Sequence, residues 1–150
     1  MRIARDGTWY YQGSPIERPA LVKLFSTVLR RDEKGAFWLT TPVENGRIEV
    51  EDAPFMAVEL AKDGGDGDQV IRLRTNVDDW IRLDAEHPLR VEEGTDQEPR
   101  PYVMVRNGLE ARLARPVFYQ LVDLGVAAVH DRDVLGVWSA GTFFPLGRTS

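Results

Sequence analysis

One succession of predicted elements occurs twice in this chain of 150 residues, and it constrains the fold more than any other feature. Each copy has a strand, a glycine-containing turn, a returning strand, an Arg-Pro pair, an amphipathic segment and a strand with tryptophan. The Arg-Pro pairs are Arg18-Pro19 and Arg115-Pro116. Proline suits the first turn of a helix, because the N–H that it lacks would have no partner there. Each pair therefore predicts a helix that begins soon after a strand.

The clearest helix begins at Pro19. Apolar residues follow it at the spacing of a single helical face: Leu21, Leu24, Phe25, Val28 and Leu29. We expect this helix to end at Arg30 and Arg31, where positive side chains suit the negative end of the helix dipole.

Two Asn-Gly pairs are typical of tight β-hairpin turns, one at Asn45-Gly46 and the other at Asn107-Gly108. If the second pair is a two-residue turn, strict alternation places one set of side chains on a common face: Tyr102, Met104, Arg106, Leu109, Ala111 and Leu113. Arg106 is the only charged residue of that set. An arginine on such a face must pair with an acid, extend into solvent or bind an anion.

These patterns predict an α+β fold of two related strand–turn–strand–helix–strand units with antiparallel sheets. We place the N-terminal unit at residues 1–53 and the C-terminal unit at residues 54–150. Two copies form a facing pair, since a stacked solenoid needs at least about three repeats. A shared interface of this kind is a preferred place for a ligand cleft.

The composition excludes several classes of protein. A net charge of −5 argues against binding a nucleic acid polymer or an anionic membrane, both of which need a basic surface. No apolar run approaches the roughly 20 residues that cross a bilayer. The absence of cysteine excludes disulfides and thiolate zinc sites, and is compatible with the cytoplasmic location that we expect.

The sequence contains few residues and motifs that are typical of catalytic sites. The chain has two histidines and none of the common nucleophile, phosphate-loop, dinucleotide or zinc-protease motifs. We therefore expect no catalytic residues, no metal and no cofactor. The sequence favours a protein that is not an enzyme, without deciding the question.

Arginine dominates the basic residues, with 16 arginines against three lysines. Its planar guanidinium suits carboxylate and phosphate recognition, although genomic base composition can produce the same bias. Arg18 and Arg115 are expected beside helix N-termini, which favour anions, so two such corners facing each other would hold a phosphate. The candidate ligand-binding residues are Arg18, Asn76, His87, Arg90, Arg106, Arg115 and Tyr119.

Several segments together resemble the bacterial family catalogued as domain of unknown function 1285. They are Arg5–Trp9, Gly13–Ile16, Leu24–Ser26, Val50–Phe55, His87–Arg90, Val105–Ala111 and Val117–Tyr119. The resemblance implies a duplicated core and a C-terminal part similar to pleckstrin-homology-like folds. It also implies a role in signalling through a nucleotide-type ligand held between the two parts, and it supplies no catalytic residues.

Three functions stay open at this point. The leading hypothesis is a ligand-binding or sensory protein that recognises an anionic small molecule, such as a nucleotide, in a cleft between the units. The first alternative is a protein-interaction module that binds a partner protein through an exposed face or sheet edge. The second is an enzyme with an unfamiliar site, such as a hydrolase that uses Asp52 or His87.

Overall fold

A computed structural model describes residues 1–42, 44–65, 67–93 and 98–148, so the last two residues of the predicted C-terminal unit lie outside it. Within these residues, strands dominate, and they form two six-stranded sheets and one three-stranded sheet beside two helices. The α+β prediction of repeated units is confirmed in this coarse form, with more strand than we expected. Both helices are too short to cross a bilayer.

The first sheet contains the N-terminal strands in the order β3-β2-β1-β6-β5-β4. Their bounds are β1 (Arg2–Ile3), β2 (Trp9–Tyr11), β3 (Ser14–Pro15), β4 (Leu29–Arg31), β5 (Phe37–Thr41) and β6 (Glu44–Val50). β1 and β6 pair in parallel, and the other neighbours are antiparallel. Ile3, Trp9 and Leu29 are buried, and helix α1 (Pro19–Thr27) packs on them through Phe25, which stacks on Trp9.

The second sheet has the order β10-β11-β12-β7-β8-β9. Its strands are β7 (Phe55–Asp63), β8 (Val70–Thr75), β9 (Trp80–Arg82), β10 (Leu89–Glu93), β11 (Pro99–Arg106) and β12 (Leu109–Leu113). Again one central pair, β12 with β7, is parallel while the others are antiparallel. The expectation of purely antiparallel sheets was therefore wrong at the centre of each sheet.

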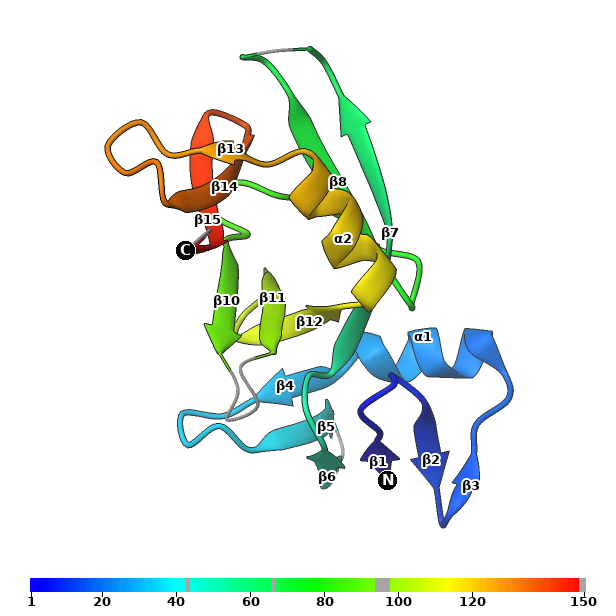
Figure 1. Cartoon of the computed structure of the whole chain (residues 1–150). Coiled ribbons are helices and arrows are strands. Elements are labelled where there is room, and N and C mark those ends of the chain that lie inside the picture. The colour runs from blue at the N-terminus through cyan, green and yellow to red at the C-terminus, as the bar shows by residue number, and fades with distance from the viewer. Residues whose placement is uncertain (43, 66, 94–97, 149–150) are drawn as a thin grey trace.

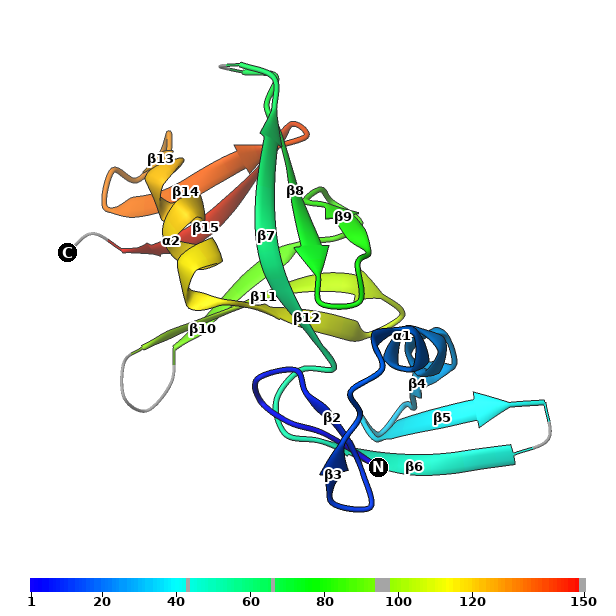
Figure 2. The ribbon, with the colours of Figure 1, turned by 90° about the vertical axis from the view of Figure 1, so that its right-hand side faces the viewer.

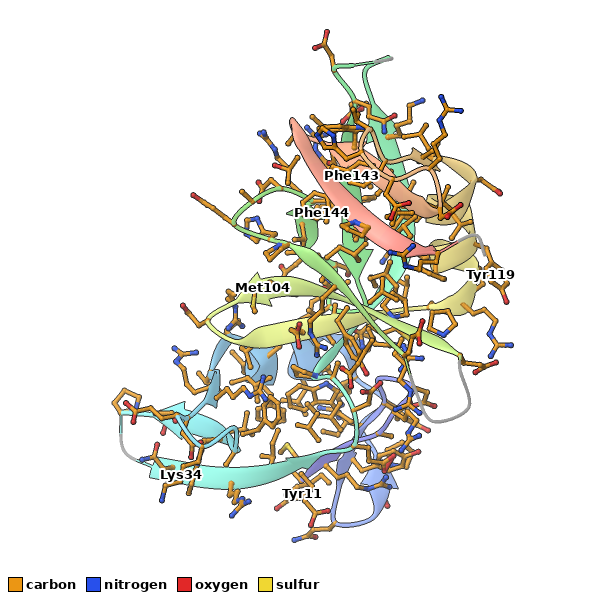
Figure 3. All side chains as sticks on the ribbon, turned by 60° about the vertical axis from the view of Figure 1, so that its left-hand side comes forward. Tyr11, Lys34, Met104, Tyr119, Phe143 and Phe144 are labelled. Atoms are coloured by element: carbon orange, nitrogen blue, oxygen red, sulfur yellow. The ribbon has the colours of Figure 1, made fainter. Side chains whose placement is uncertain are left out.

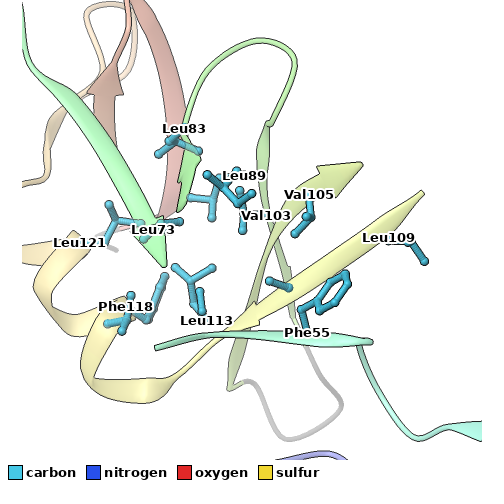
Figure 4. Close-up of a cluster of buried hydrophobic side chains, with 14 of the residues drawn as sticks. Phe55, Leu73, Leu83, Leu89, Val103, Val105, Leu109, Leu113, Phe118 and Leu121 are labelled. Atoms are coloured by element: carbon cyan, nitrogen blue, oxygen red, sulfur yellow. The ribbon is translucent and has the colours of Figure 1, made fainter. Parts of the chain in front are cut away.

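Helix α2 (Arg115–Asp123) fills the concave side of the second sheet, which bends around it (Figure 1). The last strands, β13 (Val126–Ala127), β14 (Val134–Ser139) and β15 (Thr142–Arg148), form the three-stranded sheet beside this helix. Leu73, Leu113, Phe118 and Leu121 are buried where helix and sheet meet (Figure 4). Removing such apolar side chains from water is the main force that stabilises a domain of this size.

The predicted repeat is present in the structure. β2, β3, α1, β4, β5 and β6 follow one another as β11, β12, α2, β13, β14 and β15 do. In both copies a hairpin leads into a nine-residue helix, which three antiparallel strands follow. Copies with little sequence identity thus share an order of elements, because strand and helix formation depends on patterns rather than on particular residues.

The predicted end of the first helix was wrong. α1 stops at Thr27, where the N–H of Val28 donates to the carbonyls of Phe25 and Ser26. Leu29–Arg31 then forms a strand, and Leu29 is fully buried against the first sheet. Leu29 continues the 3.6-residue period by coincidence, so periodicity alone could not separate a longer helix from a helix followed by a strand.

The two Asn-Gly pairs had different outcomes. Asn107 and Gly108 adopt φ angles of 47° and 80° between β11 and β12, so this turn is confirmed. Asn45 and Gly46 lie within β6 instead, because Thr41 already pairs with Glu44 before them. The preceding strand ends earlier than the Asn-Gly signal indicated.

A β-bulge changes the predicted face of the second hairpin. Met104 pairs with Glu110 and Arg106 pairs with Leu109, so Val105 is an extra residue on β11. A bulge shifts the alternation by one position. Arg106 keeps its place beside Leu109, but Tyr102 and Met104 lie on the other face, and that part of the prediction was wrong.

Candidate functional site

A groove of about 500 Å³ lies where α1 meets the second sheet. It is lined by the last turn of α1 and the start of β4, by the β8–β9 turn and by the β11–β12 turn, all close together in Figure 2. The lining residues are Lys23, Ser26, Thr27, Arg30, Val77, Asp79, Arg106 and Asn107. The groove therefore has walls from both repeat units.

Polar contacts hold the two walls together. Lys23 forms an ion pair of 2.5 Å with Asp78 of the β8–β9 turn. Nη1 of Arg31 donates to the carbonyl of Gly108 at 3.0 Å. These contacts tie α1 and the following strand β4 to two loops of the second sheet.

Arg106 lies at the end of β11 and is only partly exposed. Its Nη2 donates to the carbonyl of Ser26 at 2.7 Å, and its guanidinium lies 5.9 Å from the ring centre of Phe55. Burial lowers the pKa of Arg106, and the nearby positive charge of Arg30 lowers it further, whereas Asp79 raises it. The side chain thus carries its charge in a partly desolvated place.

Arg30 lies on the opposite wall. Its Nη1 donates to the carbonyls of Leu29 at 2.8 Å and Thr27 at 3.2 Å. Throughout the part of the chain that the structure describes, neither Arg30 nor Arg106 forms an ion pair with an acid. Two guanidinium groups therefore share the groove without a paired carboxylate to neutralise them.

The charge of Lys23 is already balanced. Its partner Asp78 also pairs with Arg74 at 2.9 Å, and Arg74 pairs with Glu59 at 3.0 Å. The hydrogen bond and charge of Lys23, followed by those of Arg74, lower the pKa of Asp78. The arginines, rather than the lysine, give the groove its available positive charge.

Among the predicted ligand-binding residues, only Arg106 lines this groove. Arg18 is exposed at the start of α1, at the far end of the helix from Arg30. Arg115 starts α2 and pairs with Glu98 at 3.4 Å, beside a smaller pocket of about 70 Å³. α1 contacts the turn before β12, whereas α2 follows the opposite end of that strand (Figure 2). The structure does not bring Arg18 and Arg115 together.

Tyr119 and Arg90 lie elsewhere on the second unit. Tyr119 projects from α2 with 58% of its surface exposed and lines the small pocket beside Arg115 (Figure 3). Arg90 on β10 donates to both carboxylate oxygens of Glu110, at 2.8 and 2.9 Å, and its guanidinium covers the ring of Tyr102. These hydrogen bonds raise the pKa of Arg90, so its charge is engaged within the sheet.

Asn76 and His87 make contacts within the fold. Oδ1 of Asn76 accepts from the N–H of Met56 at 3.1 Å, and its Nδ2 donates to the carbonyl of Gly7 at 3.3 Å. Nδ1 of His87 lies 2.9 Å from Asp84. Burial would raise the pKa of Asp84, but the hydrogen bonds and charge of His87 outweigh it, so that pKa is lowered.

Asp52, the other residue considered for hydrolysis, joins the units at their boundary. It accepts a hydrogen bond of 2.6 Å from the Tyr102 hydroxyl and one of 2.8 Å from Arg112. The described residues contain no cluster of three or more metal-binding side chains. The arrangement around Asp52 holds the linker to the second sheet, so this carboxylate is engaged within the fold.

Sequence reasoning missed Arg30 and Asp79 as groove residues. Arg30 was assigned to the end of the helix dipole, because the helix was expected to continue to Arg31. The turn that carries Asp79 reaches α1 only through the packing of the two units, and no local pattern indicates that contact.

Two family models cover nearly the whole chain. The model of the N-terminal domain of DUF1285, a domain of unknown function, matches residues 1–53. The model of the C-terminal domain of DUF1285, a protein of unknown function, matches residues 54–146. The chain belongs to the DUF1285 family. The groove of this DUF1285 protein therefore lies between the two family domains.

Two solved structures of DUF1285 family proteins are similar to the chain. The protein from Silicibacter pomeroyi DSS-3 is 48% identical, with a TM-score of 0.92 over 99% of this chain and 80% of that one. The protein from Shewanella baltica OS155 is 25% identical, with a TM-score of 0.65 over 81% of this chain and 89% of that one. No curated protein matches the chain.

Proposed function

We propose that this DUF1285 protein is a binding or sensory protein for a phosphate-bearing small molecule, which it holds in the groove between α1 and the second sheet. One observation carries the proposal. Arg30 and Arg106 share that groove, and neither has a carboxylate partner among the described residues. A nucleotide is one ligand of this class, and a signalling role would follow from ligand-dependent contact between the units.

The physical case rests on charge and desolvation. Guanidinium groups form strong, charge-assisted hydrogen bonds with phosphate oxygens, and they do so best where water is partly excluded. Burial and then the charge of Arg30 lower the pKa of Arg106, and an anion between the two arginines would relieve the repulsion between them. Because the arginines come from different units, the bound anion would strengthen the interface between them.

Calorimetric titration with inorganic phosphate and with adenosine monophosphate tests this function. Hydrogen bonds to charged groups contribute about 1.5–3 kcal/mol, so Arg106→Ala and Arg30→Ala should each weaken binding by about tenfold or more. Arg115→Ala is the matched control, since it removes an arginine at the start of α2, outside the groove. Binding of neither compound, or an equal loss in Arg115→Ala, would contradict the proposal.

A protein-interaction role is the second candidate, favoured by an exposed apolar surface on the three-stranded sheet. Val129 is 80% exposed and Trp138 is 41% exposed, and both line a pocket with Phe143 and Pro145. Figure 3 shows Phe143 on this outer sheet. Such surfaces often mark protein contacts. Light scattering of the protein and of Trp138→Ser tests for self-association through it. The expected similarity of the C-terminal unit to pleckstrin-homology-like folds would also lead to a protein-interaction role of this kind.

A further inference from the structure

The groove contains an acid as well as two arginines. Asp79 lines it together with Arg30 and Arg106, and its charge acts on Arg106. Among the described residues, no hydrogen bond or ion pair of the Asp79 carboxylate is found. A site for a bare anion would be better served by a neutral residue here, because like charges a few ångströms apart repel each other.

The fold holds Asp79 at this place through its backbone. Thr75 is fully buried, and its hydroxyl accepts from the N–H of Asp79 at 3.2 Å and from that of Val77 at 3.3 Å. The N–H of Thr75 in turn donates to the carbonyl of Asp79 at 2.8 Å. The N–H of Asp78 also donates to the carbonyl of Thr75 at 2.9 Å, so four hydrogen bonds close the turn between β8 and β9 and fix the backbone of Asp79 beside the groove.

The preceding aspartate has a different environment. Asp78 adopts a left-handed φ of 66°, and its carboxylate pairs with Lys23 and Arg74. Two consecutive aspartates in one tight turn therefore differ: Asp78 neutralises the lysine of the groove, and Asp79 stays available. The charges left for a ligand are those of two arginines and one aspartate.

We infer that the ligand carries a hydrogen-bond donor, a hydroxyl or an amino group, near its phosphate, and that Asp79 accepts a hydrogen bond from this donor. This inference rests on the proposed phosphate-binding function and narrows its ligand class. An ionised carboxylate only accepts hydrogen bonds, so it rewards donors and rejects additional phosphate oxygens. The groove volume of about 500 Å³ is sufficient for a hydroxyl-bearing phosphate monoester.

Calorimetry with three phosphate monoesters tests the inference. Methyl phosphate has no donor on its organic part, ribose 5-phosphate has hydroxyl groups, and phosphoethanolamine has an amino group. We expect at least one donor-bearing ester to bind about tenfold more tightly than methyl phosphate, as a charge-assisted hydrogen bond predicts. Asp79→Ala should remove that preference while methyl phosphate binds equally well or more tightly, since a repulsive charge is gone.

Asp78→Ala is the matched control. It removes the neighbouring carboxylate from the same turn, and it should change the affinities of all three esters by similar factors. If phosphate esters bind and Arg106→Ala weakens them, but Asp79→Ala affects all three equally, the donor inference is overturned and the proposed function stands. If donor-bearing esters bind no more tightly than methyl phosphate, the inference is overturned as well. If none of the esters and no inorganic phosphate binds, both proposals are overturned.

Discussion

The two helices of the repeat occupy equivalent places in their units and differ in how deeply they are buried. Counted from Pro19 and Pro116, Leu24 and Leu121 hold the same position. Leu24 is 61% exposed, whereas Leu121 is completely buried. The same residue at the same point of the repeat thus lies on the surface in one unit and in the core of the other.

The surroundings of each helix explain the difference. α2 lies inside the bend of the second sheet and buries Val117, Phe118 and Leu121. The only buried residue of α1 is Ser26, whose carbonyl accepts a hydrogen bond from Arg106. A helix enclosed by a sheet stabilises the core, while α1, which lies where the two units meet, leaves its other side chains at least partly exposed. Equivalent helices of the repeat are thus buried to different depths because their surroundings differ.

The largest expected effect distinguishes the two equivalent leucines. Leu121→Ala should lower the free energy of unfolding by about 2–5 kcal/mol, because it removes a fully buried side chain and leaves a cavity. Leu24→Ala should change it by no more than about 0.5 kcal/mol, as is usual at exposed positions. Urea unfolding of both variants measures the difference. Similar losses in the two proteins would show that the helices are buried alike.

The tryptophan strands offer a second pair of equivalent positions, Ala36 and Gly136, each two residues before a tryptophan. A Cβ atom at Gly136 would lie 2.3 Å from Cζ of Phe143 and 2.7 Å from the carbonyl oxygen of Phe144. Gly136→Ala should therefore cost about 1–3 kcal/mol or more through overpacking. Ala36→Gly should cost at most about 1 kcal/mol. Thermal unfolding of both variants checks the order, and a harmless Gly136→Ala would refute it.

Ser139 has a role that Leu39, its counterpart beside Trp38, cannot fill. Its buried hydroxyl accepts from the N–H of Ile71 at 2.9 Å and donates to the carbonyl of Leu83 at 2.6 Å. Ser139→Ala should lower the unfolding free energy by about 1–3 kcal/mol, because both buried groups lose their partner.

The exposed hydroxyl of Thr27 is the control for Ser139. It donates to the carbonyl of Leu24 at 2.6 Å, within reach of water. Thr27→Val should change the unfolding free energy by less than about 0.5 kcal/mol. Chemical denaturation compares the two, and an equal effect would contradict a special role of the buried hydroxyl.

The smallest expected effect concerns pH and the contact between the units. The ion pair with Lys23 holds the pKa of Asp78 below its ordinary value of 3.8. A carboxylate with a lowered pKa stabilises the fold above that ordinary value, and this contribution is lost as the pH falls through the folded-state pKa. Lys23→Met should thus be less stable than the original protein at about pH 5, and the gap should narrow toward about pH 3. A gap that widens on acidification would exclude this role for the ion pair.

Much of the fold could be predicted because its signals are local. Pro19 and Pro116 each mark the first turn of a helix, and Asn107-Gly108 marks a hairpin, since these residues restrict their own backbone angles. The signals that failed depend on partners elsewhere. Asn45-Gly46 became part of β6 through its pairing with β5, and the bulge at Val105 appears only in the register with β12.

The residues of the candidate site also divide into those that local sequence indicates and those that depend on distant partners. Arg106 could be singled out, because an arginine on an otherwise apolar face needs a special environment. Arg30 and Asp79 could not, since their place in the groove depends on α1 meeting two turns of the second unit. We predicted that Arg18 and Arg115 face each other, on the assumption that the N-terminal ends of the two equivalent helices lie close together. In the structure, β12 separates them instead (Figure 2).

The sequence by itself determined that the chain repeats one order of strands and a helix, where each helix begins, and which arginine lies at the end of an apolar face. These follow from backbone angles and from the spacing of apolar residues, which act over a few positions. Only the tertiary structure decided which helix is enclosed, where the units meet and that two arginines and an aspartate share one groove. Those outcomes depend on how two sheets pack and bend, and contacts between residues about eighty positions apart leave no local pattern in the sequence.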